Sequence, residues 1–156
     1  MKINLKKLLP CLLIPLAVGA LAGWITAGAM DRFALLQKPP LSPPAWLFPV
    51  VWTVLYLLMG FSLYLVLQMA LSRMARTAAL RIWGVQLAAN FLWPILFFSL
   101  GIYGFAFFWL ILLWLLVLRM IVLFRRLRPI AGTLQLPYLL WLTFAAYLNL
   151  GIWILN

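Results

Sequence analysis

The third apolar segment of the chain, residues 80–100, carries two amides and two aromatic rings in a regular pattern. Gln86, Asn90, Trp93 and Phe97 fall at i, i+4, i+7 and i+11, so in a helix they form one stripe. Because side-chain amides are costly to expose to lipid, we expect this stripe to face other helices. Aromatic walls with a few fixed hydrogen-bond donors suit the binding of a flat, largely apolar molecule with polar edges.

Two further segments carry comparable stripes. On residues 136–155 the stripe consists of Tyr138, Trp141, Ala145, Asn149 and Ile152. On residues 46–71 it consists of Trp52, Tyr56 and Met59 or Leu63. If the three faces turn inward they enclose one pocket, and the predicted ligand-binding residues are Trp52, Tyr56, Asn90, Trp93, Phe97, Trp141, Ala145 and Asn149.

A simpler reading of the same residues remains open. The aromatic rings could be core filler or interfacial belts, and Asn90 and Asn149 could serve only to link neighbouring helices. This alternative has most weight for Asn149. Pro94, directly after Trp93, is expected to kink the third helix beside the pocket.

The composition excludes most hydrolytic and metal chemistry. The chain has no His and no Glu, one acid (Asp31) and one cysteine (Cys11). Paired carboxylates, a Ser-His-Asp triad and a His/Cys/Asp metal cage therefore cannot be built from a single chain. We predict no catalytic residue, no metal ligand and no required cofactor.

The elements that must position the stripes are membrane helices. The 156 residues are 69% hydrophobic with a mean hydropathy of +1.17, well above the apolar content of a soluble domain. Five apolar segments are long enough to span a bilayer, and spans in lipid must be helical unless they form a closed barrel. The sequence predicts an all-α integral membrane protein, a single domain over 1–156, with helices at about 8–30, 46–71, 80–100, 105–124 and 136–155.

The basic residues predict the orientation. Ten of the twelve cations precede the first span or lie around the second and fourth connections, and only Arg32 and Lys38 lie in the first. The positive-inside rule then places the N-terminus in the cytoplasm and the C-terminus outside. Basic loops and strongly hydrophobic helical spans suit a bacterial inner membrane. Anionic lipids are expected partners, and nucleic acid is not, because the cations are scattered over separate loops.

A proline-rich segment connects the first two spans. It reads Lys38-Pro39-Pro40-Leu41-Ser42-Pro43-Pro44. Proline fixes φ and biases its predecessor toward extended geometry, so this loop is stiff and cannot continue either helix. It could be a lid folded over the bundle, or only a helix stop signal, and composition leaves both open.

Three stretches resemble the TspO/MBR family of tryptophan-rich sensory and translocator proteins. They are "ALLQKPPLSPPAWLFPVVWTVLYLLMG", "QLAANFLWPILFF" and "PYLLWLTFAAYLNLGIW", in family order and spacing. The resemblance implies a five-helix bundle whose first loop caps a pocket, with Lys38, Pro39, Leu41, Pro43 and Pro44 as lid residues. It also implies binding of tetrapyrroles such as protoporphyrin or haem, or other flat hydrophobic ligands, and a homodimer. Gly84 and Ala88 form a candidate dimer face.

The chain departs from the family pattern in its first loop and last helix. Leu41 stands where many members have Trp, and Arg32-Phe33 replaces a common Trp-Tyr pair, which removes aromatic surface from the lid. The Tyr and basic residue of the eukaryotic sterol motif are also missing from residues 148–154. The resemblance as a whole implies a tetrapyrrole receptor or transporter. A light- or oxygen-dependent porphyrin-degrading enzyme and a membrane scaffold or stress-regulatory protein are the alternatives.

Overall fold

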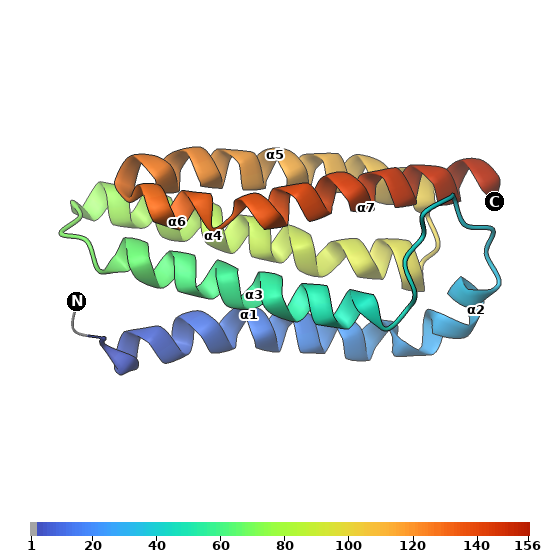
Figure 1. Ribbon diagram of the computed structural model, residues 1–156, viewed down its shortest axis with the longest axis horizontal. Helices are drawn as coiled ribbons and strands as arrows, with labels where there is room; N and C mark the ends of the chain where they lie inside the picture. Colours follow the sequence, from blue (N-terminus) through green and yellow to red (C-terminus); the bar gives the residue numbers. More distant parts are fainter. Residues whose placement is uncertain (1–2) are drawn as a thin grey trace.

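The computed structural model describes residues 3–156 and is an elongated helical bundle (Figure 1). Within these residues it contains no strand and has five helical stretches long and apolar enough to cross a membrane. The predicted fold class is confirmed. The helices are α1 (Leu5–Thr26), α2 (Met30–Ala34), α3 (Leu47–Leu67), α4 (Arg73–Pro94), α5 (Tyr103–Leu127), α6 (Pro129–Thr133) and α7 (Leu136–Leu155), with a 3₁₀ turn η1 (Ala27–Ala29) and a π-helical turn η2 (Ile95–Ser99).

The third span begins earlier than hydropathy predicts. The boundary expected near residue 80 is wrong, because α4 starts at Arg73 after Ser72, whose Oγ accepts a 3.2 Å hydrogen bond from the Ala75 amide. Arg73 and Arg76 therefore lie on the helix. Long basic side chains are tolerated at a helix end because their charged heads reach the interface.

The third and fourth spans, predicted at about 80–100 and 105–124, are joined by a short connection. After Pro94, which lacks an amide hydrogen, the helix widens into η2, where the Leu100 amide donates to the Ile95 carbonyl at 3.0 Å. The chain then reverses at Gly101, whose φ of +67° favours glycine. The irregularity expected at Pro94 thus takes the form of a π-helical turn.

Helices α1 and α3 are in contact at one end of the bundle and leave space at the other. A Cβ placed on Gly60 would lie 2.2 Å from the Cys11 carbonyl oxygen, so the two backbones touch there. A Cβ on Gly23, farther along α1, would meet nothing within 4 Å. The bundle is consequently dense near Gly60 and open near Gly23.

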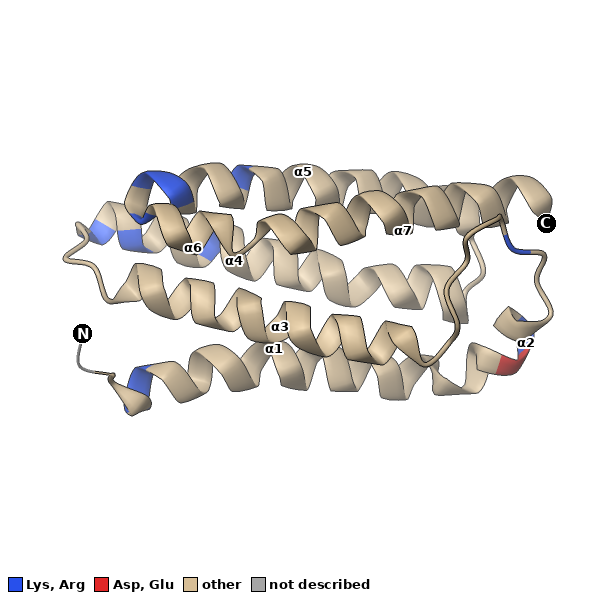
Figure 2. Ribbon diagram, in the orientation of Figure 1, with Lys and Arg blue, Asp and Glu red and all other residues tan. Residues whose placement is uncertain are grey.

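Charge separates the same two ends. In Figure 2 most Lys and Arg residues gather at the end that holds the N-terminus and the α3–α4 and α5–α6 connections. The opposite end carries the C-terminus, the α2–α3 loop, Asp31 and a few cations. Lys2, counted among the ten cations, lies outside the described residues. The distribution agrees with the separation of charge on which the predicted topology is based.

Candidate functional site

The α2–α3 loop folds over the end of the bundle. In Figure 1 it runs from α2 across to the end of α7 and then back along the bundle to the start of α3. Pro39 is buried against Gly151 of α7, where a Cβ would lie 2.6 Å from the proline ring. Tyr147 donates its hydroxyl hydrogen to the Pro40 carbonyl at 2.8 Å. Of the two readings of the prolines, the structure favours the lid.

The individual lid residues have different environments. Lys38 and Pro43 line the space below the loop, together with Ser42, whose Oγ donates to the Pro39 carbonyl at 2.7 Å. Pro44 is exposed. Leu41 is 83% exposed, lies in the left-handed region at φ +66°, and lines neither lobe of the cavity described next. An aromatic side chain at position 41 would therefore extend away from this cavity unless the loop changed conformation.

A cavity with two lobes lies beneath the loop. The first lobe has a volume of about 430 Å³ and the second about 620 Å³, both within the size range of small-molecule sites. The residues that line both lobes are Met30, Phe33, Ala45, Phe48, Trp93 and Phe98. The second lobe extends between α1, α3 and α4, where Gly23 leaves space.

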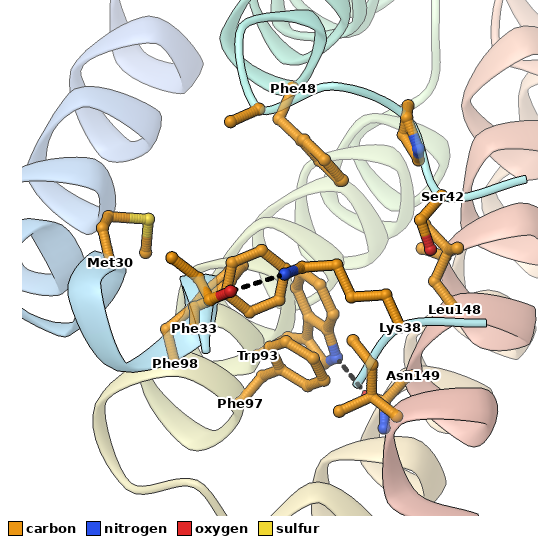
Figure 3. A pocket seen from close by; sticks show the side chains of 15 residues that line it. Met30, Phe33, Lys38, Ser42, Phe48, Trp93, Phe97, Phe98, Leu148 and Asn149 are labelled. Carbon is orange, nitrogen blue, oxygen red and sulfur yellow. Dashed lines mark hydrogen bonds between the residues drawn. The ribbon is translucent and has the colours of Figure 1, made fainter. Parts of the chain in front are cut away.

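The site residues predicted from the third span are brought together as expected. Trp93 and Phe97 stack with ring centroids 5.3 Å apart, and both line the first lobe (Figure 3). Asn90, 2% exposed, lies in the second lobe with Trp52 and Tyr56, whose rings stack at 5.6 Å. Ala145 and Asn149 of α7 complete the first lobe.

Trp141 does not join this group. It lines neither lobe, and its ring packs edge-on against Phe48 at a centroid distance of 5.9 Å. The expectation that Trp52, Trp93 and Trp141 enclose one pocket is therefore wrong for Trp141. Phe48, in the first turn of α3, lies between it and the cavity side of the bundle. The indole Nε1 of Trp141 is buried and has no hydrogen-bond partner among the described residues.

A chain of buried hydrogen bonds links α3, α4 and α7 at the base of the cavity. Tyr56 donates to the Asn90 Oδ1 at 2.7 Å, and the Asn90 Nδ2 donates to the Tyr138 hydroxyl at 2.7 Å. Tyr138 in turn donates to the Gln86 Oε1 at 3.0 Å. Asn90 therefore both links helices and lines the cavity, so the two readings of this residue are compatible.

Asn149 likewise both links helices and lines the cavity. Its Oδ1 accepts from the Trp93 indole at 3.1 Å (Figure 3), and its Nδ2 donates to the Tyr103 carbonyl at 2.8 Å. The side chain is fully buried and holds the Trp93 ring in place. Its main task is to orient that ring, because both ends of its amide already have protein partners.

Several lining residues were missed by the sequence patterns. Phe48 lies four residues before Trp52 and extends the stripe of the second span, so helical spacing could have found it. Tyr138, which heads the stripe of the fifth span, was not placed at the site either; it lines neither lobe but belongs to the hydrogen-bond chain at the base of the cavity. Phe33 gave no spacing signal, since it precedes the loop and reaches the cavity by packing on Phe98 at 5.0 Å.

Arg32, one of the departures from the family pattern, supports the end of the third span. Its guanidinium donates to the Phe98 carbonyl and, at 2.7 Å, to the Ser99 carbonyl. These carbonyls lie at the end of η2, where the regular helical bonds stop. The residue lies outside the two-lobed cavity and acts on its wall through Phe98.

Comparison with known proteins gives a consistent match. The model of the TspO/MBR family matches residues 11–154. The chain is 37% identical to the tryptophan-rich protein TspO of Archaeoglobus fulgidus over 98% of its own length and 99% of that protein. It is 40% identical to protein CrtK of Rhodobacter capsulatus, covering 78% of this chain and 76% of that one. It is 39% identical to the translocator protein of Ovis aries, covering 78% and 72% respectively.

Proposed function

This chain belongs to the TspO/MBR family, and we propose that it is a membrane receptor or transporter-like protein whose cavity binds a tetrapyrrole such as protoporphyrin or haem. The observation that carries this proposal is the cavity itself. It has aromatic walls, few polar groups and a proline loop over its end. A planar macrocycle can lie against Trp93 and Phe97, and its polar edge can turn toward the loop.

The proposal is tested by titrating the purified protein in non-ionic detergent with protoporphyrin IX while following the absorption band of the porphyrin. Wild type should bind saturably. Trp93→Leu should weaken binding about tenfold, because it removes a stacking wall as well as apolar contact area. Trp24→Leu is the matched control, since Trp24 is 76% exposed and lines neither lobe.

Two outcomes would favour the other functions. Equal binding by wild type and Trp93→Leu places the porphyrin elsewhere, and absence of saturable binding favours a scaffold or stress-regulatory role. Degradation predicts a new pigment spectrum under illumination that is absent in the dark. In that reaction an indole such as Trp93 would be the redox participant, since the described residues include no cluster of three potential metal ligands.

We further propose a membrane topology from the distribution of the basic residues and a dimer contact from the small-residue surface of α4. The basic end lies in the cytoplasm of a bacterial cell, the loop and C-terminus lie outside the inner membrane, and anionic lipids contact the basic end. Gly84 and Ala88 are exposed on α4, and a Cβ on Gly84 would meet nothing within 4 Å. This small-residue face is our candidate for a homodimer contact, testable by cysteine cross-linking at position 88.

A further inference from the structure

We infer that Lys38 makes the cavity selective for ligands that carry a carboxylate at one edge, as a dicarboxylic porphyrin does. This inference rests on the proposed tetrapyrrole binding and narrows its substrate class. Its basis is the position of one ammonium group at the mouth of an apolar cavity.

The Lys38 side chain extends from the lid across the first lobe. In Figure 3 its Nζ lies beside Phe33, near the centre of the group of lining side chains. The Nζ is 4.9 Å from the centroid of the Phe33 ring. It donates to the Ala34 carbonyl at 3.2 Å and to the Leu36 carbonyl at 3.5 Å. An ammonium has three donors, and the second of these bonds is long, so donor capacity remains for a ligand.

This ammonium has no charged partner among residues 3–156. Its contacts there are two backbone carbonyls and an aromatic ring, none with a formal negative charge. The only acidic side chain of the chain is Asp31, which lines neither lobe. Lys38 is also the only charged residue among those that line either lobe. The cavity therefore offers one positive charge that the protein itself does not neutralise.

The apolar walls increase the effect of this charge. Phe33, Phe97, Phe98 and Leu148 surround the first lobe, and charge–charge interactions are stronger where such groups exclude water. A ligand carboxylate that meets the Nζ gains a charge-assisted hydrogen bond, whereas an ester or a neutral sterol gains no charge interaction. Because Lys38 is itself exposed, water screening limits the gain.

The lid holds the ammonium in position. Pro39 directly follows Lys38 in the sequence, and its buried ring packs on Gly151. The Ser42 hydroxyl donates a hydrogen bond to the Pro39 carbonyl. Trp93 lies deeper in the cavity than the Lys38 ammonium, so Trp93 and Lys38 together define an orientation for the ligand. The apolar plate lies against the indole, and the carboxylate lies at the mouth under the loop.

The experiment compares a charged and an uncharged form of one macrocycle. Protoporphyrin IX and its dimethyl ester are titrated against wild type, Lys38→Met and Lys38→Arg, each full-length in non-ionic detergent. Wild type should bind the diacid about five- to tenfold more tightly than Lys38→Met does, while the ester should bind both equally. Lys38→Arg should retain the preference for the diacid.

A second cation separates direct contact from long-range charge. Arg32→Gln removes one positive charge from the same end of the protein but outside the cavity. Because Arg32 also supports the cavity wall through Phe98, any loss of affinity in this variant should be equal for the diacid and the ester, so the ratio of the two affinities should keep its wild-type value. Equal affinities of wild type and Lys38→Met for the diacid overturn the inference. So does a loss of the preference for the diacid in Arg32→Gln that is as large as the loss in Lys38→Met. If neither porphyrin binds wild type saturably, the proposed function itself fails. If wild type binds the diacid and the ester saturably and with equal affinity, the proposed tetrapyrrole binding holds and only the role of Lys38 is refuted.

Discussion

Asn90→Ala tests whether the buried hydrogen-bond chain holds α3, α4 and α7 together. The substitution removes two 2.7 Å bonds, one accepted from Tyr56 and one donated to Tyr138. Tyr138 keeps its bond to Gln86, but Asn90 is the partner of the Tyr56 hydroxyl in the described structure. Side-chain bonds between membrane helices contribute about 0.6 kcal/mol on average and about 1.7 at most. Two such bonds, with one buried donor left unpaired, give an expected loss of about 2 kcal/mol.

The assay is unfolding in mixed micelles with increasing SDS, followed by far-UV circular dichroism so that tryptophan emission plays no part. Thr143→Ala is the matched control, because exposed Thr143 makes one bond to another helix, accepted from Trp114 at 2.9 Å, and its other bond, donated at 3.0 Å, goes to the Leu139 carbonyl of its own helix. Its cost should be no more than about 0.6 kcal/mol.

A double-mutant cycle isolates the bond itself. Tyr56→Phe keeps the ring and removes the hydroxyl, so the Asn90–Tyr56 pair should show a coupling free energy of about 1 kcal/mol. If Asn90→Ala costs no more than Thr143→Ala, or if the cycle gives no coupling, the bonds do not stabilise the bundle. The cavity would then be shaped by apolar packing alone.

Four glycine substitutions test other parts of the structure. Gly60→Ala should destabilise the protein by about 1–3 kcal/mol in the same SDS unfolding assay, because the added Cβ would meet the Cys11 backbone, whereas Gly23→Ala, with open space around it, should be neutral or stabilising by up to about 1 kcal/mol. Gly23→Leu should fill part of the second lobe and weaken porphyrin binding at unchanged unfolding free energy; unchanged affinity would remove that lobe from the site. Gly151→Val should displace Pro39 and raise the dissociation rate of bound porphyrin, measured by stopped-flow transfer to apomyoglobin; an unaltered rate would mean that the lid does not retain the ligand.

The number of spans and much of the site could be predicted because each depends on a local pattern. Hydropathy reports burial in lipid over about 20 residues, and helical spacing reports which side chains share a face. This was sufficient to place Asn90, Trp93 and Phe97 on one wall. The start of α4 was missed because Arg73 and Arg76 lower the mean hydropathy of residues 73–79, which are nevertheless helical.

What could not be predicted depends on how the helices are rotated and spaced. Trp141 shares a stripe with Ala145, but the first turn of α3 places Phe48 against its ring, and no pattern within α7 reports that contact. Phe33 reaches the cavity only because α2 and η2 pack together beside the loop. The pairing of Asn90 with two tyrosines likewise depends on the relative positions of α3, α4 and α7 along the bundle axis.

The position of the cavity restricts how a ligand could move. The long helices that line its lobes are α1, α3, α4 and α7, each through residues in the half nearest the loop, among them Gly23, Trp52 and Asn149. The other half is filled: Met59 is fully buried, and α1 and α3 touch at Gly60. Passage from the cavity to the basic end would require α1 and α3 to separate at this contact, at the cost of their packing. Entry and release on the loop side require only movement of the lid or of the open seam at Gly23. Binding and release on one side of the membrane therefore demand far less rearrangement than transport across it.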